Sequence, residues 1–247
     1  MNSISDINNN EIVTCPHCKD NNICKYGYVK KRQRYRCKNC GRTFTSYTNK
    51  PWSNSRISIE VWDKYLSLMD NKNTLLECSR ILGINIKTAF RMRHKIMDII
   101  QENNGLLQGV VGIVRRVYYE NRKGSKNIEE PRRKYNLHFG VDSQENSFLD
   151  INDDIMSVNL VADIIKCKIH NDAVILPSNN RFVNKAIGPR IKSGGTIEYL
   201  NVCREYSFYK IWNYEFRGVA TKYIYSYYSW YRNKGKVRRR VYDIVHS

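Results

Sequence analysis

The spacing of four cysteines limits what the first 50 residues of this chain can fold into. They lie in the stretch CPHCKDNNICKYGYVKKRQRYRCKNC as two Cys-x-x-Cys pairs, and eighteen residues separate the pairs. Each pair can point two thiolates at one tetrahedral metal ion, and the segment between them has the length of a small β-hairpin that brings the pairs together. We therefore expect a zinc ribbon over residues 1–50, with one structural Zn²⁺ held by four ligands: Cys15, Cys18, Cys37 and Cys40.

A zinc ion would supply folding energy that so small a module lacks. A site of this kind contributes on the order of 10 kcal/mol of apparent folding free energy, which a core of this size cannot provide alone. Cys24 and His17 lie in the same stretch and have the chemistry of zinc ligands. Because the two pairs already complete a four-coordinate site, we interpret both residues as bystanders.

The charge of the chain indicates a polyanionic partner. Its 247 residues include 42 Lys and Arg against 23 Asp and Glu, a formal net charge of +19, and the basic residues recur along most of the chain. Nucleic acid is the commonest partner for such a balance, so we expect duplex DNA. There is no apolar run of membrane-spanning length and no cleavable signal pattern, so we expect no membrane partner and a cytoplasmic location, nucleoid-associated in a bacterium.

The predicted hairpin carries its own cations. The segment YVKKRQRYRC alternates basic and aromatic residues, which on a hairpin directs Lys and Arg toward a phosphate backbone. The DNA-binding residues expected here are Lys30, Lys31, Arg32 and Arg34. A hairpin face that is merely solvated is the alternative interpretation.

Residues 54–104 have the periodicity of helices. Apolar residues recur at three and four positions over the first of them: Ile59, Trp62, Tyr65, Leu66 and Met69. Thr74, with Glu77 at the capping-box position, starts a second helix that ends near Gly83, where a tight turn is permitted. The segment INIKTAFRMRHKIMDII then forms a third, basic helix, and this order is the outline of a helix-turn-helix.

The third helix would read DNA. Ala89, Phe90, Ile96 and Met97 would pack inward. The expected DNA contacts are Lys87, Arg91, Arg93, His94 and Lys95. Any small three-helix bundle gives a similar pattern, and the preceding ribbon and the basic charge favour the helix-turn-helix.

The remaining residues, 106–247, mix strand and helix patterns. GVVGIVRRVYY, KYNLHFGVD and DAVILP predict strands; SVNLVADIIK, NVCREYSFYKIWNYEF and GVATKYIYSYYSWYR predict helices. Strands followed by helices that close over a sheet imply an α/β domain, which makes the whole chain a multi-domain α+β protein. We expect the aromatic residues of the last helix to pack on that sheet, and KGKVRRR to be a flexible basic end suited to phosphate contact.

Several motifs together resemble one family. CPHC, QRYRCKNCGRTFT, TAFRMRHKI, LLQGVVGI and RGVATKYIYSYYSWYR are similar to motifs of the Merlin-related, ISXO-type insertion-sequence transposases of bacteria, and the resemblance runs from about Cys15 to Arg232. It implies a zinc ribbon, a helix-turn-helix that binds transposon ends, and an RNase H-like, DDE-type domain that cuts and joins DNA strands. Transposases of this kind work as multimers, so a homo-oligomer is compatible with the resemblance.

The catalytic positions implied by the resemblance are replaced in this chain. Such chemistry uses two divalent metals roughly 4 Å apart, and Mg²⁺ requires oxygen ligands, chiefly carboxylates. The first catalytic Asp of the family falls on Val114, beside Arg115, and the second falls on Asn179. The third polar position falls on Cys203, and only the lysine seven residues later, Lys210, is kept.

The first hypothesis is therefore a transposase-derived DNA-binding protein, a pseudoenzyme kept as a regulator. Arg115 and Arg116 would repel Mg²⁺ and attract phosphate, and Mg²⁺ would be needed only if catalysis survives. The second hypothesis is an active transposase with displaced metal ligands, such as Asp142, Asp172 and Glu205. The third is an RNA-binding or scaffold protein that uses the basic ribbon and the aromatic C-terminal region.

Overall fold

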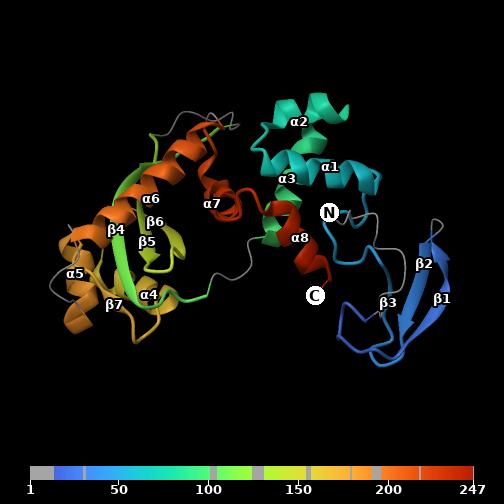
Figure 1. Ribbon diagram of the computed structural model, residues 1–247, viewed down its shortest axis with the longest axis horizontal. Helices are drawn as coiled ribbons and strands as arrows, with labels where there is room; N and C mark the ends of the chain where they lie inside the picture. Colours follow the sequence, from blue (N-terminus) through green and yellow to red (C-terminus); the bar gives the residue numbers. More distant parts are fainter. Residues whose placement is uncertain are drawn as a thin grey trace. The chain divides into compact units, whose positions relative to one another are not determined.

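The computed structural model describes residues 14–29, 32–100, 105–123, 131–153, 157–178, 180–190, 196–216 and 218–246. The chain divides into two compact units (Figure 1). The first combines Met1–Ile100 with Asn233–Ser247, and the second is Gln101–Arg232. The sequence placed residues 233–247 with the last domain, whereas the structure groups them with the first hundred residues.

The first unit begins with a three-stranded antiparallel sheet in the order β1-β2-β3. Its strands are β1 (Ile23–Val29), β2 (Arg32–Cys37) and β3 (Thr43–Thr45). β1 and β2 form the hairpin expected between the cysteine pairs. A small core of Cys15, Cys37 and Phe44, with Ile23 and Tyr35 packed against it, lies on one side of this sheet. So little apolar area is consistent with a module that depends on a metal for stability.

Three helices follow, at the positions that the periodicity predicts: α1 (Ile59–Asp70), α2 (Leu75–Leu82) and α3 (Ile86–Ile100). The predicted capping box of α2 is present, since the Thr74 side chain accepts from the backbone N–H of Glu77 and the Glu77 carboxylate accepts from that of Thr74. Gly83 ends α2 with a φ of 62°, a left-handed conformation that glycine adopts without strain.

The core of this bundle combines apolar and polar contacts. Trp62, Tyr65, Leu66 and Met69 of α1 are buried, as expected from their spacing. The Tyr65 hydroxyl donates to the backbone carbonyl of Ala89 in α3 over 2.6 Å. This hydrogen bond fixes α3 against α1 at the point where the two helices pack.

The segment expected to be a flexible basic end is a helix, α8 (Val237–His246). It packs against α1 and α3 within the first unit. Val237 and Val241 are fully buried there, four residues apart on one face of the helix. The expectation was wrong because it weighed only the charges of KGKVRRR and not the apolar periodicity of the residues that follow.

The second unit is built on a four-stranded sheet in the order β6-β5-β4-β7. Its strands are β4 (Val110–Tyr119), β5 (Lys134–Asp142), β6 (Ser147–Asp153) and β7 (Val174–Ile175). β4, β5 and β6 form an antiparallel meander, and β7 pairs parallel with β4. The sequence predicted β4, β5 and the region of β7, but not β6.

Helices cover both faces of this sheet: α4 (Val158–Lys168), α5 (Arg181–Ile187), α6 (Thr196–Tyr214) and α7 (Ile224–Arg232). Short 3₁₀ turns lie at Gly188–Arg190 and Thr221–Tyr223. α4 crosses over between β6 and β7, which permits β7 to run parallel to β4. The helix patterns predicted α4, α6 and α7, and α5 was not predicted.

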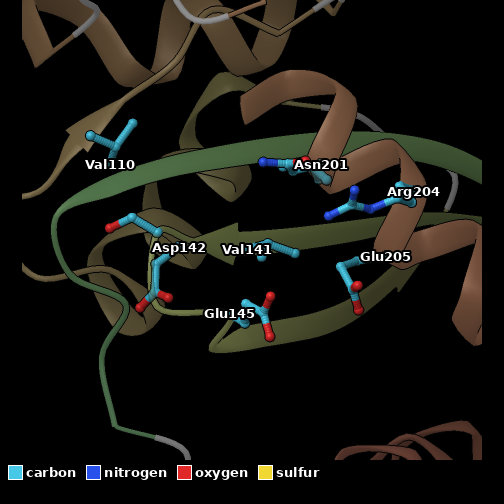
Figure 2. A pocket seen from close by; sticks show the side chains of 9 residues that line it. Val110, Val141, Asp142, Glu145, Asn201, Arg204 and Glu205 are labelled. Carbon is cyan, nitrogen blue, oxygen red and sulfur yellow. The ribbon is translucent and has the colours of Figure 1, made fainter. Parts of the chain in front are cut away.

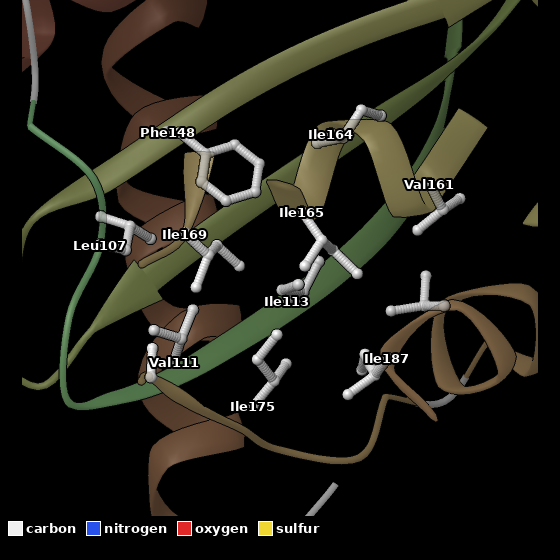
Figure 3. Close-up of a cluster of buried hydrophobic side chains, with 12 residues drawn as sticks. Leu107, Val111, Ile113, Phe148, Val161, Ile164, Ile165, Ile169, Ile175 and Ile187 are labelled. Atoms are coloured by element: carbon white, nitrogen blue, oxygen red, sulfur yellow. The ribbon is translucent and has the colours of Figure 1, made fainter. Parts of the chain in front are cut away.

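One sheet face forms an aliphatic core with α4 and α5 (Figure 3). Val111 and Ile113 of β4, Ile165 of α4 and Ile175 of β7 are among its buried members. Gly140 lets the Phe148 ring lie across β5, because a Cβ at position 140 would stand 2.3 Å from a ring carbon.

The opposite face packs on α6 and α7 through aromatic rings. Phe139 of β5 contacts Tyr209 of α6 and Tyr228 of α7, and Trp212 of α6 meets Trp230 of α7 edge to face at 5.1 Å. The Tyr228 hydroxyl and Ser147 Oγ share a buried hydrogen bond of 2.5 Å. The aromatic residues of the last predicted helix thus contribute to packing, as expected. Among the described residues, no helix is both long enough and apolar enough to cross a membrane.

Candidate metal centre and nucleic-acid interface

The four cysteines converge on one point. The turns before β1 and after β2 bring Cys15, Cys18, Cys37 and Cys40 together, with all four Sγ atoms within 4.8 Å of one another. Cys15 Sγ lies 3.6 Å from Cys40 Sγ, and Cys18 Sγ lies 3.5 Å from Cys37 Sγ. Sulfurs bound to one tetrahedral Zn²⁺ stand about 3.8 Å apart, given a Zn–S bond near 2.3 Å. The cluster can therefore hold a metal such as zinc.

The thiols also need a cation if they are to ionise together. Burial alone would raise the pKa of Cys15, but backbone N–H groups of His17 and Cys18 overcome this and lower it to about 7. For Cys18, the backbone N–H of Asp20 acts to lower the pKa, but burial and the neighbouring thiols raise it to about 12. The Cys15 thiol thus ionises easily, and ionisation of Cys18 beside it is unfavourable. A bound dication would compensate the repulsion between the two thiolates.

Neither expected bystander belongs to the cluster. Cys24 Sγ donates to the backbone carbonyl of Arg36 over 3.6 Å, and His17 is exposed. Among the described residues, the four cysteines are the single group of three or more His, Cys, Asp or Glu side chains that could hold a metal ion.

The ribbon presents arginines on the sheet face opposite its core. Arg32 lies over the Tyr47 ring at 3.7 Å, and Arg34 and Arg36 both lie near the ring of Tyr26. Arg34 also donates to Thr43 Oγ1 over 2.8 Å. Stacking holds these guanidinium groups in place. Lys30 and Lys31, also predicted to bind DNA, lie outside the described residues.

α3 presents three exposed cations along one face. Lys87, Arg91 and Lys95 are spaced four residues apart, and all three are exposed. Lys95 Nζ donates to the backbone carbonyl of Ser53 over 3.2 Å. His94 is half-buried, with its ring 4.2 Å from that of Phe90, which is itself only partly buried.

Arg93 is a correction to the predicted DNA-binding set. Its side chain is only 1% exposed, and its guanidinium donates to the backbone carbonyl of Asn73 over 2.6 Å. Arg93 lies on the face of α3 that also buries Ala89, Ile96 and Ile100. It therefore connects α3 to the turn before α2, and a nucleic acid cannot reach it.

In the part of the chain that the structure describes, no group of carboxylates that could hold a metal lies at the centre of the second sheet. Val114, where the resemblance places the first catalytic Asp, is fully buried in β4. Arg116, on the same face two residues later, donates to Cys203 Sγ over 3.6 Å and lies 5.7 Å from the Tyr206 ring. Cys203, where the resemblance places the third polar group, therefore lies beside the positively charged guanidinium of Arg116.

The other face of the sheet carries both signs of charge at this level, because β-pairing aligns Arg115 with His138 and His138 with Asp150. Arg115 donates through Nε to Asn136 Oδ1 over 2.7 Å, and β-pairing sets Arg115 opposite His138. Burial, with Arg115 as a second cause, lowers the pKa of His138 to about 4, so the imidazole is neutral at pH 7. This part of the sheet disfavours any further positive charge.

Two further positions are implied by the resemblance, Asn179 and Lys210. Asn179 lies outside the described residues. The flanking loop is closed by Asn184, whose side chain accepts from the Ser178 backbone N–H and donates to the Ser178 carbonyl. Lys210 is exposed on α6.

Among the described residues, the acids proposed as displaced ligands do not form a group that could hold a metal ion, although Asp142 and Glu205 line the same hollow. Asp142 caps the β5–β6 turn, where its carboxylate accepts from the backbone N–H groups of Gln144 and Asn146. Asp172 has a side chain 91% exposed beside His170. Glu205 accepts from the Tyr231 hydroxyl over 3.3 Å.

A shallow hollow near these acids is mixed in charge (Figure 2). Asp142 and Glu145 line it from the β5–β6 end, and Asn201, Arg204 and Glu205 line it from α6. The three carboxylates of the hollow do not converge into a group that could hold a metal ion, the Asp142 carboxylate is hydrogen-bonded within the turn, and Arg204 adds a positive charge.

No family model matches this chain. Over 102 residues the chain is 26% identical to an uncharacterized protein in transposable element ISH50 of Halobacterium salinarum (strain ATCC 700922 / JCM 11081 / NRC-1). Its similarity is to a transposable-element protein. The match covers 41% of this chain and 35% of that protein, so it spans about a third of the relative's length.

A solved structure has a remote likeness. The Mos1 transposase paired-end complex with left transposon end aligns with 74% of this chain and 77% of its own, at 10% sequence identity and a TM-score of 0.31. At that score the likeness carries no argument about this chain's fold.

Proposed function

We propose that this chain is a transposase-derived DNA-binding protein that has lost strand-transfer catalysis. The observation that carries the proposal is the contrast within the chain between a complete cysteine cluster and a sheet centre where Arg116 lies against Cys203. A strand-transfer site needs carboxylates at these positions to hold two Mg²⁺ ions. A guanidinium in their place binds phosphate and repels the metal.

The ribbon and the helices would supply the binding. In this proposal Zn²⁺ occupies the four-cysteine cluster and holds the β1–β2 hairpin, whose Arg32 and Arg34 contact DNA phosphates. α3 would lie in the major groove as the recognition helix, with Lys87, Arg91 and Lys95 toward the duplex. The capped α2 and the Gly83 turn support the helix-turn-helix interpretation of α2 and α3.

The second unit supports descent from a DDE-type enzyme. Its antiparallel meander β4-β5-β6, followed by the crossover helix α4 and a parallel β7 next to β4, is the connectivity expected of an RNase H-like domain. Sequence similarity to a transposable-element protein points in the same direction. In our proposal this unit is kept as a folded, non-cutting part of the protein, and homo-oligomers remain compatible with it.

Selection from random DNA tests the proposal. Zinc-loaded protein is incubated with a pool of random duplexes at near-physiological salt, and the bound fraction is sequenced. We expect an enriched motif, which is lost in the variant Arg91→Ala/Lys95→Ala although that variant keeps the melting temperature of the parent. Arg93→Ala is the matched contrast, because it removes a buried cation of α3 and should lower stability first.

The enriched duplex then serves as substrate for two further tests. Incubation with Mg²⁺ or Mn²⁺ should give no nicking, and metal-dependent cleavage that is lost when Asp142 and Glu205 are changed would instead establish an active transposase. Competition with single-stranded RNA should leave the duplex bound. A preference for RNA would overturn the DNA-binding proposal in favour of the third hypothesis.

A further inference from the structure

α8 is tied to the first unit by two carboxylates of α1. Asp70 accepts from the backbone N–H groups of Val237 and Arg238, over 2.6 and 3.2 Å, and so caps the first turn of α8. Asp63 binds the Arg238 guanidinium through both oxygens, at 2.9 and 2.8 Å. A bidentate pair of this kind fixes orientation as well as position.

The contacts leave a cationic face outside. Val237 and Val241 are buried against α1 and α3, while Lys236, Arg239 and Arg240 are exposed. At 100° per residue, Arg239 lies opposite the valines, and Lys236, one residue before α8 begins, and Arg240 lie on the same exposed flank within about 100° of it. Asp243 is the one acid in α8, and it lies on the same outer side.

We propose that the outer face of α8, formed by Lys236, Arg239 and Arg240, binds the phosphate backbone of duplex DNA beside the site of α3. This inference rests on the proposed function, because it adds a second phosphate-binding element to the same unit. The partner is identified by its chemistry, since exposed guanidinium and ammonium groups on one helix face match the acceptors of a phosphodiester backbone.

The capping contacts explain why this face differs from a solvated basic tail. A flexible tail loses conformational entropy when it binds, whereas the cations of α8 are already positioned by the helix. The acids that could neutralise them from α1, Asp63 and Asp70, are committed to Arg238 and to the helix N-terminus. On α8 itself, Asp243 lies four residues after Arg239 and three after Arg240, so three cations against one acid leave the outer face with a net positive charge for an external anion.

The first experiment measures how DNA affinity depends on salt. The variant Lys236→Gln/Arg239→Gln/Arg240→Gln is compared with the parent on one duplex between 50 and 300 mM salt. Each lost phosphate contact should reduce the slope of log K against log salt by about 0.9, so the variant should lose about two to three. The control Lys166→Gln/Arg181→Gln/Lys185→Gln removes the same charge from exposed sites of the second unit and should keep the parent slope.

The second experiment keeps the three cations and removes the cap that orders the first turn of α8. Asp70→Ala deletes the cap of α8 without changing Lys236, Arg239 or Arg240. We expect faster proteolysis after Lys234 or Lys236 and a several-fold weaker DNA affinity, with the first helices still folded by circular dichroism. An unchanged affinity in Asp70→Ala would show that the ordered helix is irrelevant to binding and would overturn the inference.

The outcomes separate this inference from the proposed function. If the parent protein binds no duplex, the proposed function fails. If the parent binds but both triple variants have the parent slope, or if both lose the same amount, the α8 face is not a phosphate site and only the inference fails. A slope reduced in the α8 variant alone supports both.

Discussion

The four-cysteine cluster and the centre of the second sheet both occupy positions suited to metal ligands, and they differ in the charge that they bring. The cluster gathers four sulfurs, and the neighbouring thiols help to raise the pKa of Cys18. The sheet centre brings its own cations, Arg115 and Arg116, and its buried His138 stays neutral. The first region can therefore hold a metal, whereas the charges of the second disfavour one.

This contrast teaches that the residues that determine a fold and the residues that perform its chemistry are different. The connectivity of a fold depends on many apolar positions and tolerates change at a few polar ones. A two-metal site depends on a few carboxylates, and side chains such as those of Val114 and Cys203 cannot replace them. In our proposal the frame of the second unit is therefore kept although strand-transfer chemistry is lost.

The largest expected effect comes from removing one ligand of the four-cysteine cluster. Cys15→Ser removes one of four sulfur ligands, so we expect the loss of bound zinc and of the ribbon fold, whose metal-dependent free energy is on the order of 10 kcal/mol. Zinc content by atomic absorption and the amide spectrum of residues 14–50 check this. Cys167→Ser, at an exposed thiol outside the cluster, should change neither, and equal behaviour of the two variants would contradict a structural metal.

The next prediction tests whether the second region can be made to accept a metal. Val114→Asp places a carboxylate at a fully buried position, and we expect a loss of about 3 to 5 kcal/mol in the free energy of unfolding. Mg²⁺ should not restore stability, because a single carboxylate does not form a site. Val114→Asn is the uncharged control. A urea midpoint that rises with Mg²⁺ only in Val114→Asp would show that this variant binds Mg²⁺, and would contradict the prediction.

A smaller effect concerns the pH dependence of the second unit. The pKa of His138 is about 4 in the folded protein and near 6.5 when unfolded, so the unfolded chain takes up the proton first. Stability from this residue is fully present above about pH 6.5, falls by up to about 3 kcal/mol as the pH drops to about 4, and is constant below that. Urea unfolding of the parent and of His138→Phe at pH 7 and 4.5 measures this contribution to the free energy of unfolding. An equal loss of stability in both proteins between the two pH values would refute the prediction.

The smallest expected effect tests whether the fold depends on Arg116. Its side chain is partly exposed and contacts a sulfur acceptor, an aromatic ring and a neighbouring carbonyl. We expect Arg116→Gln to lower the free energy of unfolding by less than about 1 kcal/mol. A loss above 2 kcal/mol, measured by urea unfolding beside the exposed control Arg181→Gln, would mean that the fold depends on Arg116.

Local sequence rules predicted the parts whose causes are local. The cysteine spacing places both pairs at the ends of a hairpin, and Thr74, Glu77 and Gly83 mark the limits of α2 by capping chemistry alone. The apolar spacing of Trp62, Tyr65 and Met69 likewise predicts the buried face of α1.

The missed features needed information from distant contacts or a closer reading of periodicity. β6 carries Asp150 and Asp153, which lower its strand propensity, and pairing with β5 stabilises it. Arg93 stands four residues after Ala89 and three before Ile96, so its place on the buried face was readable, but its partner, the Asn73 carbonyl, was not. The same holds for α8, whose Val237 and Val241 have helical spacing and whose cap lies on α1.

The return of α8 to the first unit has a consequence for how the protein is made. The ribosome synthesises the ribbon and the first three helices first, but it synthesises α8, which packs against α1 and α3, only after Gln101–Arg232. At about 5–20 residues per second that delay is on the order of ten seconds. Until then the nascent chain carries α1 and α3 without the packing of α8, so completion of this bundle waits for the second unit to be synthesised.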